Sequence, residues 1–218
     1  MPALLEDPST KIPPSAAHSA SAPQLCPRKA LLKDQSTTVT LHPISQGPQS
    51  VPAGLIDLLH REFSAEIERG CTYPMETPMG RDQFADYWFG TFAVVALLGD
   101  EADGLARADR DWEKDCLGTF YIKPNYPGRC SHVCNAGFLT TTAARNRGAG
   151  LVMAEAYLDY APKLGYKYSV FNLVFENNVA SVKIWEKLGF QVIGRVPGAA
   201  RLANSSDLVD ALIIGKQL

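Results

Sequence analysis

The segment FLTTTAARNRGAG, residues 138–150, places two arginines among glycines at the start of an expected helix. Arg145, Gly148 and Gly150 have the spacing R-x-x-G-x-G, and Arg147 adds a second cation. Glycine lets a backbone approach a phosphate closely, and the free N–H groups of a helix's first turn point at an anion. The pattern therefore favours phosphate or pyrophosphate binding. A solvated glycine turn beside two surface arginines explains the same letters, so the turn alone leaves both interpretations open.

A second motif, N-x-x-S-x-x-x-W-x-x-x-G-F, follows later in the chain and is formed by Asn178, Ser181, Trp185, Gly189 and Phe190. Neither of two well-known phosphate fingerprints fits the first motif. A P-loop needs Lys-Ser or Lys-Thr after its last glycine, and a dinucleotide site needs G-x-G-x-x-G after the first strand. On its own, the serine is equally well explained as an ordinary hydroxyl at a helix start.

Hydrophobic periodicity predicts the elements that position these motifs. The strand before the turn and the strand after the following helix are joined by one crossover, so they should be parallel. The three strands between 92 and 140 are short and close in sequence, which predicts an antiparallel meander. The expected helices cover 52–70, 80–90, 148–164 and 180–189, and the expected strands cover 37–44, 92–100, 116–125, 131–140, 167–175, 190–196 and 209–216.

Composition limits the classes of function. The chain has 218 residues, 46% of them hydrophobic, which fits one domain over 36–218. Residues 1–35 are rich in Pro, Ser and Ala without periodicity, which predicts a disordered tail. With 21 basic and 23 acidic residues the net charge is −2, so neither a nucleic-acid partner nor an anionic membrane surface is expected.

The amino-terminal residues show neither a secretory signal nor a good mitochondrial presequence, so a cytoplasmic location is expected, with a mitochondrial one left open. The five cysteines are scattered and are expected to be reduced thiols. Cys130, His132 and Cys134 alternate as three strand residues could around a metal, but no second pair of ligands accompanies them. No metal is therefore predicted.

The two motifs together, separated by a crossover strand, resemble the coenzyme A motifs of the GNAT superfamily of N-acetyltransferases, and the resemblance covers about 37–218. The stretches GTFYIKPNYPGRCSHVCNAGFL, GYKYSVFNLVF and DYWFGTFAVV also resemble the fungal L-azetidine-2-carboxylate N-acetyltransferases, which acetylate proline analogues and a proline-pathway intermediate. This resemblance implies an α/β GNAT fold whose mixed central sheet, of about seven strands, is splayed at the acetyl-CoA site and flanked by helices. It also implies a small amino-acid acceptor, acetyl-CoA as donor and a homodimer.

The resemblance further implies where the donor binds. The strand before the turn would pair with the pantetheine arm, the turn and helix start would receive the pyrophosphate, and the next helix would contact the arm. The implied cofactor-binding residues are Phe138, Leu139, Thr140, Arg145, Asn146, Arg147, Gly148, Ala149, Gly150, Asn178 and Ser181.

Two departures from the family's pattern affect catalysis. Many relatives have a tyrosine as general acid where this chain has Trp185, which cannot donate a proton to a thiolate. Many also have a glutamate on the strand before the turn, where this chain offers only Asn135. The crossover strand offers a second amide, Asn172. We expect Asn135 and Asn172 to orient the acceptor as the catalytic pair, although either could instead bond a bulged backbone.

A small cyclic amino acid predicts an aromatic acceptor pocket, for which Tyr87, Trp88, Phe138 and Phe171 are the candidates. Two other functions compete with this hypothesis. The acceptor could be a protein amino terminus or lysine, which needs an open groove. The chain could also be a non-catalytic acyl-CoA-binding module, because both usual acid and base positions are non-ionisable.

Overall fold

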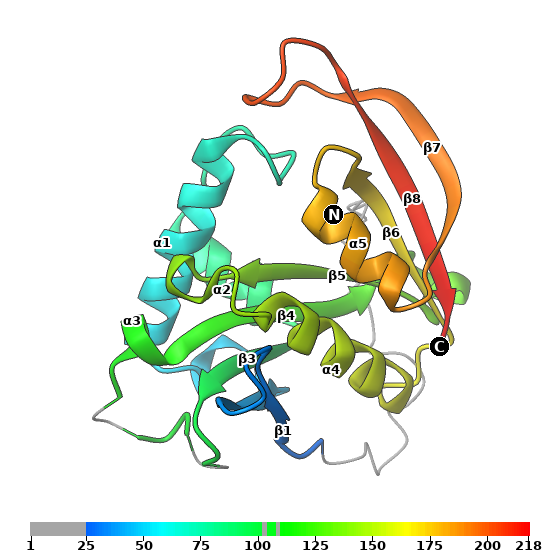
Figure 1. The fold of residues 1–218 in the computed structure, drawn as a ribbon. Helices are drawn as coiled ribbons and strands as arrows, with labels where there is room; N and C mark the ends of the chain where they lie inside the picture. The colour runs from blue at the N-terminus through cyan, green and yellow to red at the C-terminus, as the bar shows by residue number, and fades with distance from the viewer. Residues whose placement is uncertain (1–24, 102–103, 108–109) are drawn as a thin grey trace.

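The computed structural model describes residues 25–101, 104–107 and 110–218. Within these residues eight strands form one mixed sheet in the order β1-β2-β3-β4-β5-β6-β8-β7 (Figure 1). Neighbours pair antiparallel except β5 and β6, which are parallel. The strands are β1 (Arg28–Leu31), β2 (Thr38–Ile44), β3 (Phe92–Leu98), β4 (Cys116–Pro124), β5 (Val133–Thr140), β6 (Tyr168–Phe175), β7 (Gln191–Ala200) and β8 (Val209–Gln217).

The helices cover both faces of the sheet. One face carries α1 and α2, and the other carries α4 and α5, with α4 lying across the middle strands (Figure 1). The α-helices are α1 (Ala53–Arg69), α2 (Arg81–Phe89), α3 (Trp112–Asp115), α4 (Ala149–Lys163) and α5 (Val179–Lys187), and the 3-10 helices are η1 (Pro48–Ser50), η2 (Gly128–Cys130) and η3 (Thr142–Ala144).

The two cores follow from strand alternation, because successive side chains of a strand point to opposite faces. On β4, Phe120 and Ile122 belong to the core under α4, whereas Tyr121 belongs to the core under α1 and α2. Near-continuous burial along β3 and β4 shows that this part of the sheet is covered on both sides. The central strands therefore form a rigid base from which side chains can be aimed into either layer.

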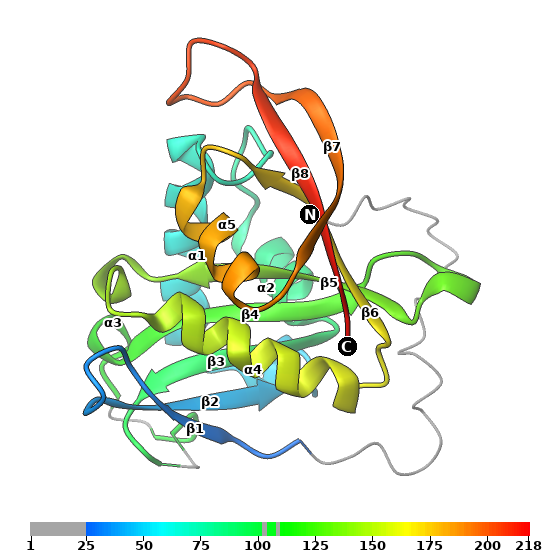
Figure 2. The ribbon, with the colours of Figure 1, turned by 45° about the vertical axis from the view of Figure 1, so that its right-hand side comes forward.

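β5 and β6 are splayed. Only two positions pair between them, Val133 with Tyr168 and Cys134 with Ser169. Beyond these pairs the two strands diverge, as Figure 2 shows, while β6 pairs with β8 on its other edge from Tyr168 to Phe175. β7 and β8 form a long twisted hairpin beside α5 (Figure 2).

The structure confirms the α/β fold, the meander, the parallel crossover and the predicted helices. It corrects two expectations. Arg28–Leu31 form an ordered strand paired with β2, although they lie inside the range expected to be a disordered tail, and the sheet accordingly has eight strands rather than about seven. The rest of that range up to residue 24 lies outside the described residues. Among the helices that the structure describes, none has the length and apolar character to cross a membrane.

Candidate active site

The site begins where the pairing of β5 and β6 ends. On the α4 side, the Tyr157 hydroxyl contacts Cys134 Sγ at 3.1 Å and Ser169 Oγ at 2.5 Å, and these two residues form the last pair of the ladder. Burial raises the pKa of Tyr157 well above its ordinary value, so this phenol stays protonated. Tyr157 thus joins both strands at the point from which they diverge.

The glycine turn lies at the amino end of α4, as the sequence predicts. Asn146 (φ 62°) and Gly148 (φ 89°) both adopt left-handed backbone conformations, and α4 starts at Ala149. A Cβ atom on Gly148 would lie 3.0 Å from Lys33 Cβ and 3.3 Å from Lys33 N, so this position also requires the absence of a side chain. The first N–H groups of α4 begin directly after this turn, as a helix start that binds an anion requires.

The two arginines of the turn differ in their partners and in their exposure. Arg145 forms an ion pair with Glu66 of α1, and Glu66 also binds Arg69 Nη1 at 2.6 Å and the Thr72 hydroxyl at 2.9 Å. Arg147 is exposed, and its carbonyl accepts the Lys33 N–H at 3.3 Å. Arg145 therefore fixes the turn to α1, whereas Arg147 remains the exposed cation of the motif.

The second motif has a visible local role. Asn178 caps α5 by accepting the Ser181 N–H at 3.2 Å, and the Ser181 hydroxyl accepts the Trp185 indole N–H at 3.1 Å. Trp185 is buried, with its ring centroid 4.5 Å from that of Phe171 and 5.0 Å from that of Phe138. These contacts place the start of α5 against the splay, and contact of Asn178 and Ser181 with a cofactor stays a prediction.

The structure brings the two predicted asparagines together through a third. Asn135 Nδ2 donates to Asn125 Oδ1 at 2.9 Å, and Asn172 Nδ2 donates to the same oxygen at 2.6 Å. Asn125 Nδ2 in turn donates to Asn172 Oδ1 at 3.2 Å. We call Asn125, Asn135 and Asn172 the amide triad. Within the described residues Asn135 Oδ1 is buried without a hydrogen-bond partner, so one acceptor at the splay is left unsatisfied.

Backbone geometry explains how the triad forms. Asn135 directly follows the last β5–β6 pair, so it lies at the apex of the splay. The pairing of β6 with β8 shifts register between Phe171 and Val174, and such a bulge re-aims the side chains within it. This bulge lets Asn172 reach across the gap to Asn125, which stands just beyond the end of β4.

The four predicted acceptor aromatics separate into two groups. Phe138 and Phe171 meet across the diverging strands, with ring centroids 6.3 Å apart, in the aromatic cluster of Trp185. Tyr87 is half-buried on the α2 side. Trp88 is fully buried, its indole N–H donates to Thr119 Oγ1 at 3.0 Å, and its ring centroid lies 5.0 Å from that of Tyr121. Its part in an acceptor pocket stays a prediction.

A cluster of tyrosines surrounds a lysine on the same side of the sheet as Tyr87. The hydroxyl groups of Tyr87 and Tyr121 are 3.0 Å apart, and Tyr73 donates to the Phe138 carbonyl at 2.7 Å. Lys123 Nζ lies 4.0 Å from the ring centre of Tyr87 and 4.2 Å from that of Tyr121, and it donates to the Tyr87 carbonyl. Burial lowers the pKa of Lys123 to about 7 and raises that of Tyr87.

Sequence reasoning missed Asn125, Lys123, Tyr121 and Tyr73. A signal existed for three of them: Tyr121, Lys123 and Asn125 alternate along β4 and its end, as residues that share one face of a strand must. Gly137 was also informative, since a Cβ there would lie 2.5 Å from the Tyr121 ring. Its absence lets that ring lie across β5.

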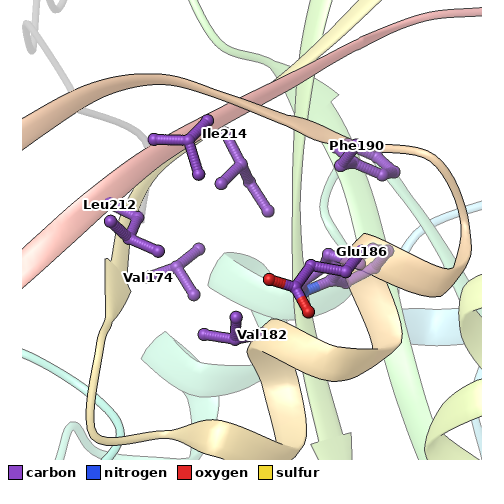
Figure 3. Close-up of a pocket in the computed structure, with 8 residues that line it drawn as sticks. Val174, Val182, Glu186, Phe190, Leu212 and Ile214 are labelled. Carbon is purple, nitrogen blue, oxygen red and sulfur yellow. The ribbon is translucent and has the colours of Figure 1, made fainter.

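An apolar pocket lies between α5 and strands β6, β7 and β8 (Figure 3). It has a volume of about 20 Å³, and its lining residues are Val174, Val182, Trp185, Glu186, Phe190, Val192, Leu212 and Ile214. A space that holds little more than one water cannot accept a substrate. The polar side chains that could orient a substrate gather at the splay instead.

In the parts of the chain that the structure describes, no group of three or more His, Cys, Asp and Glu side chains is arranged to hold a metal ion. Cys130 ends η2 and is exposed, whereas Cys134 is buried against Tyr157. The alternating ligand set considered from the sequence is thus not one continuous strand face.

Comparisons with known proteins agree with this fold. Residues 55–190 match the model of the acetyltransferase (GNAT) family. The chain is 44% identical over 163 residues to the N-acetyltransferase aca1 of Schizosaccharomyces pombe, covering 73% of this chain and 78% of that protein. It is 32% identical over 229 aligned positions to the protein SPT10 of Saccharomyces cerevisiae, covering 88% of this chain but 36% of SPT10. A GCN5-related N-acetyltransferase from Kribbella flavida superposes with a TM-score of 0.67 at 27% identity, covering 82% of this chain and 98% of that chain.

Proposed function

The chain belongs to the GNAT family of acetyltransferases and uses acetyl-CoA, and from that premise we propose that it acetylates the secondary amine of a small cyclic amino acid. L-Azetidine-2-carboxylate and related proline analogues are the proposed acceptors. The observation that carries this proposal is the amide triad, in which three neutral side chains converge at the splay and Asn135 Oδ1 has no partner among the described residues.

The residues present fit acetyl-CoA. Beyond Cys134, β5 has no ladder partner on its β6 side, so its backbone can pair with an amide-containing arm. Gly148 and the amino end of α4 offer N–H groups to a pyrophosphate, with Arg147 exposed beside them. When bound, acetyl-CoA supplies an acetyl group already activated as a thioester.

The triad suits an amine acceptor because its groups are uncharged. The unpaired Asn135 Oδ1 can accept an N–H bond from the acceptor amine and hold its lone pair in a fixed direction. Asn125 holds both other amides, so the direction of that bond is set before the substrate arrives. This arrangement contributes through orientation rather than through a change of charge.

Neither Asn135 nor Trp185 can exchange a proton at neutral pH. The Trp185 indole N–H is already donated to Ser181 Oγ. A thiol has an ordinary pKa of about 8.5, so a thiolate can depart without a side-chain acid. We propose that the acceptor's own proton leaves through water, with direct attack in a ternary complex.

A protein amino terminus or lysine is the competing acceptor. The α1–α2 loop supports the small acceptor instead. Tyr73 ties this loop to the Phe138 carbonyl, and Tyr87 contacts Tyr121 on β4, so aromatic side chains stand over the acceptor side of the splayed strand.

Thiol release from acetyl-CoA tests the proposal. The purified chain is assayed with L-azetidine-2-carboxylate, other cyclic imino acids, an amino-terminal peptide and a lysine peptide. We expect turnover with the imino acids and little with the peptides. Turnover restricted to peptides would contradict the proposed acceptor, and acetyl-CoA binding without any thiol release would favour the non-catalytic module.

A further inference from the structure

Lys123 occupies an unusual position for a lysine. Its ammonium lies between the rings of Tyr87 and Tyr121 and is largely removed from water. Among the residues that the structure describes, it forms no ion pair with a carboxylate. Lysine is rarely buried unless it is paired, because withdrawing a cation from water is costly.

Part of this position has a structural explanation. Tyr87 lies in the last turn of α2, and its carbonyl accepts one N–H bond from Lys123. A lysine at a helix carboxyl end is favoured by the helix dipole. One bond to a carbonyl and two aromatic faces still leave the cation without a counter-charge, and an ammonium has three donors. The surroundings of Lys123 therefore lack the counter-charge and the additional acceptors that a charged ammonium needs.

The register of the sheet places Lys123 next to the triad. Lys123 and Asn135 are directly opposite each other on β4 and β5, so their side chains share one face. Asn125, which holds the triad, is two positions further along the same chain segment. An amine oriented by Asn135 would thus have Lys123 on its flank.

We infer that Lys123 binds the α-carboxylate of the acceptor, so that the enzyme recognises an amino acid rather than a simple amine. This inference rests on the proposed function and names the substrate group that the triad leaves unrecognised. In a cyclic amino acid the carboxylate is attached to the carbon beside the reacting nitrogen, so both groups must be held by neighbouring side chains. The carboxylate supplies the counter-charge that the described structure lacks at Lys123. The tyrosine rings exclude water and strengthen the charge-assisted bond.

The experiment compares L-azetidine-2-carboxylate with azetidine, the same ring without its carboxylate, in the full chain and in Lys123→Met. Lys187→Met, at an exposed lysine in the last turn of α5, is the matched control. We expect the preference for the carboxylate-bearing substrate, measured as the ratio of kcat/KM values, to fall about 10- to 100-fold in Lys123→Met, the loss typical of one charge-assisted bond. The control should keep the original preference.

A structural or general-base role for Lys123 would lower activity on both substrates equally, and an unchanged preference overturns the inference. If azetidine reacts too slowly to measure, a higher KM for azetidine-2-carboxylate at nearly unchanged kcat supports the inference, and a loss confined to kcat overturns it. Acetyl-CoA affinity, measured in each variant, verifies folding. A wild-type chain that turns over no imino acid overturns the proposed function and this inference with it, whereas wild-type turnover with an unchanged preference overturns the inference alone.

Discussion

Asn125 and Asn172 exchange hydrogen bonds in both directions, from Asn125 Nδ2 to Asn172 Oδ1 at 3.2 Å and from Asn172 Nδ2 to Asn125 Oδ1 at 2.6 Å. This pair connects the end of β4 to the bulge of β6 across the splay. Because Asn135 also donates to Asn125 Oδ1, one residue holds both amides that we assign to the acceptor.

Replacing Asn125 with Ala should therefore disrupt acceptor orientation without removing a group that touches substrate. We expect kcat/KM for the imino acid to fall about 10- to 100-fold, as buried amides lose their shared partner. Acetyl-CoA affinity, measured by calorimetry, should change little. Asn177→Ala is the matched control. Asn177 is exposed, and its side chain donates a surface hydrogen bond to Asn204 Oδ1 at 3.3 Å. An equal loss of donor affinity in Asn125→Ala would contradict this positioning role.

Asn135→Ala should reduce turnover far more than acetyl-CoA affinity, because it removes the unpaired Oδ1 proposed to hold the amine. The expected loss in kcat/KM is again about 10- to 100-fold. Steady-state kinetics and donor binding are measured side by side. Parallel losses in both quantities would place Asn135 on the donor side instead.

Gly148→Ala should lower both stability and donor affinity. The residue has φ 89°, and a Cβ would meet Lys33 at 3.0 Å, so the variant is strained by about 1–2 kcal/mol and the turn must shift. Gly80→Ala is the control, since Gly80 has φ −64° and its Cβ would meet nothing within 4 Å. Thermal unfolding with and without acetyl-CoA measures both effects. Equal melting temperatures for the two variants would refute the strain argument.

Glu66→Gln should destabilise the chain by about 1–3 kcal/mol, because a mostly buried carboxylate bonded to Arg145, Arg69 and Thr72 loses its charge. Urea unfolding measures the change. Glu68→Gln, at an exposed position of the same helix, should have almost no effect. If both substitutions give the same midpoint, the Arg145 pair contributes nothing to stability.

The lowered pKa of Lys123 predicts a pH-dependent stability difference. Because the pKa of Lys123 falls from 10.5 to about 7 on folding, the unfolded chain binds more protons between these values. The wild-type protein should therefore gain stability relative to Lys123→Met as the pH rises from about 7 towards 10, and the difference should be constant below pH 7. Denaturation midpoints at several pH values test the sign. A difference independent of pH would show that Lys123 titrates normally.

The crossover from β5 through α4 to β6 was predictable because each element has a strong period and the glycine turn marks the boundary. β1 was not, because it spans four residues within a segment rich in Pro, Ser and Ala. Its formation depends on a turn in which Asp34 accepts the N–H groups of Ser36 and Thr37 at 2.9 and 2.8 Å, and on pairing with β2. Such pairing is a tertiary effect that composition does not reveal.

In the candidate site, too, some features were predictable from the sequence and others depend on tertiary pairing. Asn135 and Asn172 stood out as polar residues in apolar strands, but their common partner depends on the β4–β5 register and on the β6 bulge. Tyr87 and Trp88 are adjacent in α2, and the rotation of that helix decides their partners: the Tyr87 hydroxyl contacts the Tyr121 hydroxyl, whereas the Trp88 indole N–H donates to Thr119 Oγ1. A sequence pattern can name polar candidates, whereas register and helix rotation determine which of them meet.

The Tyr73 hydroxyl bonds to the Phe138 carbonyl, while the preceding residue, Thr72, bonds to the glutamate that holds Arg145. The α1–α2 loop is thus bonded to β5 at Phe138 and, through Glu66, to Arg145 of the glycine turn. These are the two segments proposed to bind the donor. A change that reshapes this loop to admit a different amine would also disturb the strand and turn proposed to hold acetyl-CoA. Acceptor preference should therefore be easier to alter at side chains such as Lys123 than by redesigning the backbone of this loop.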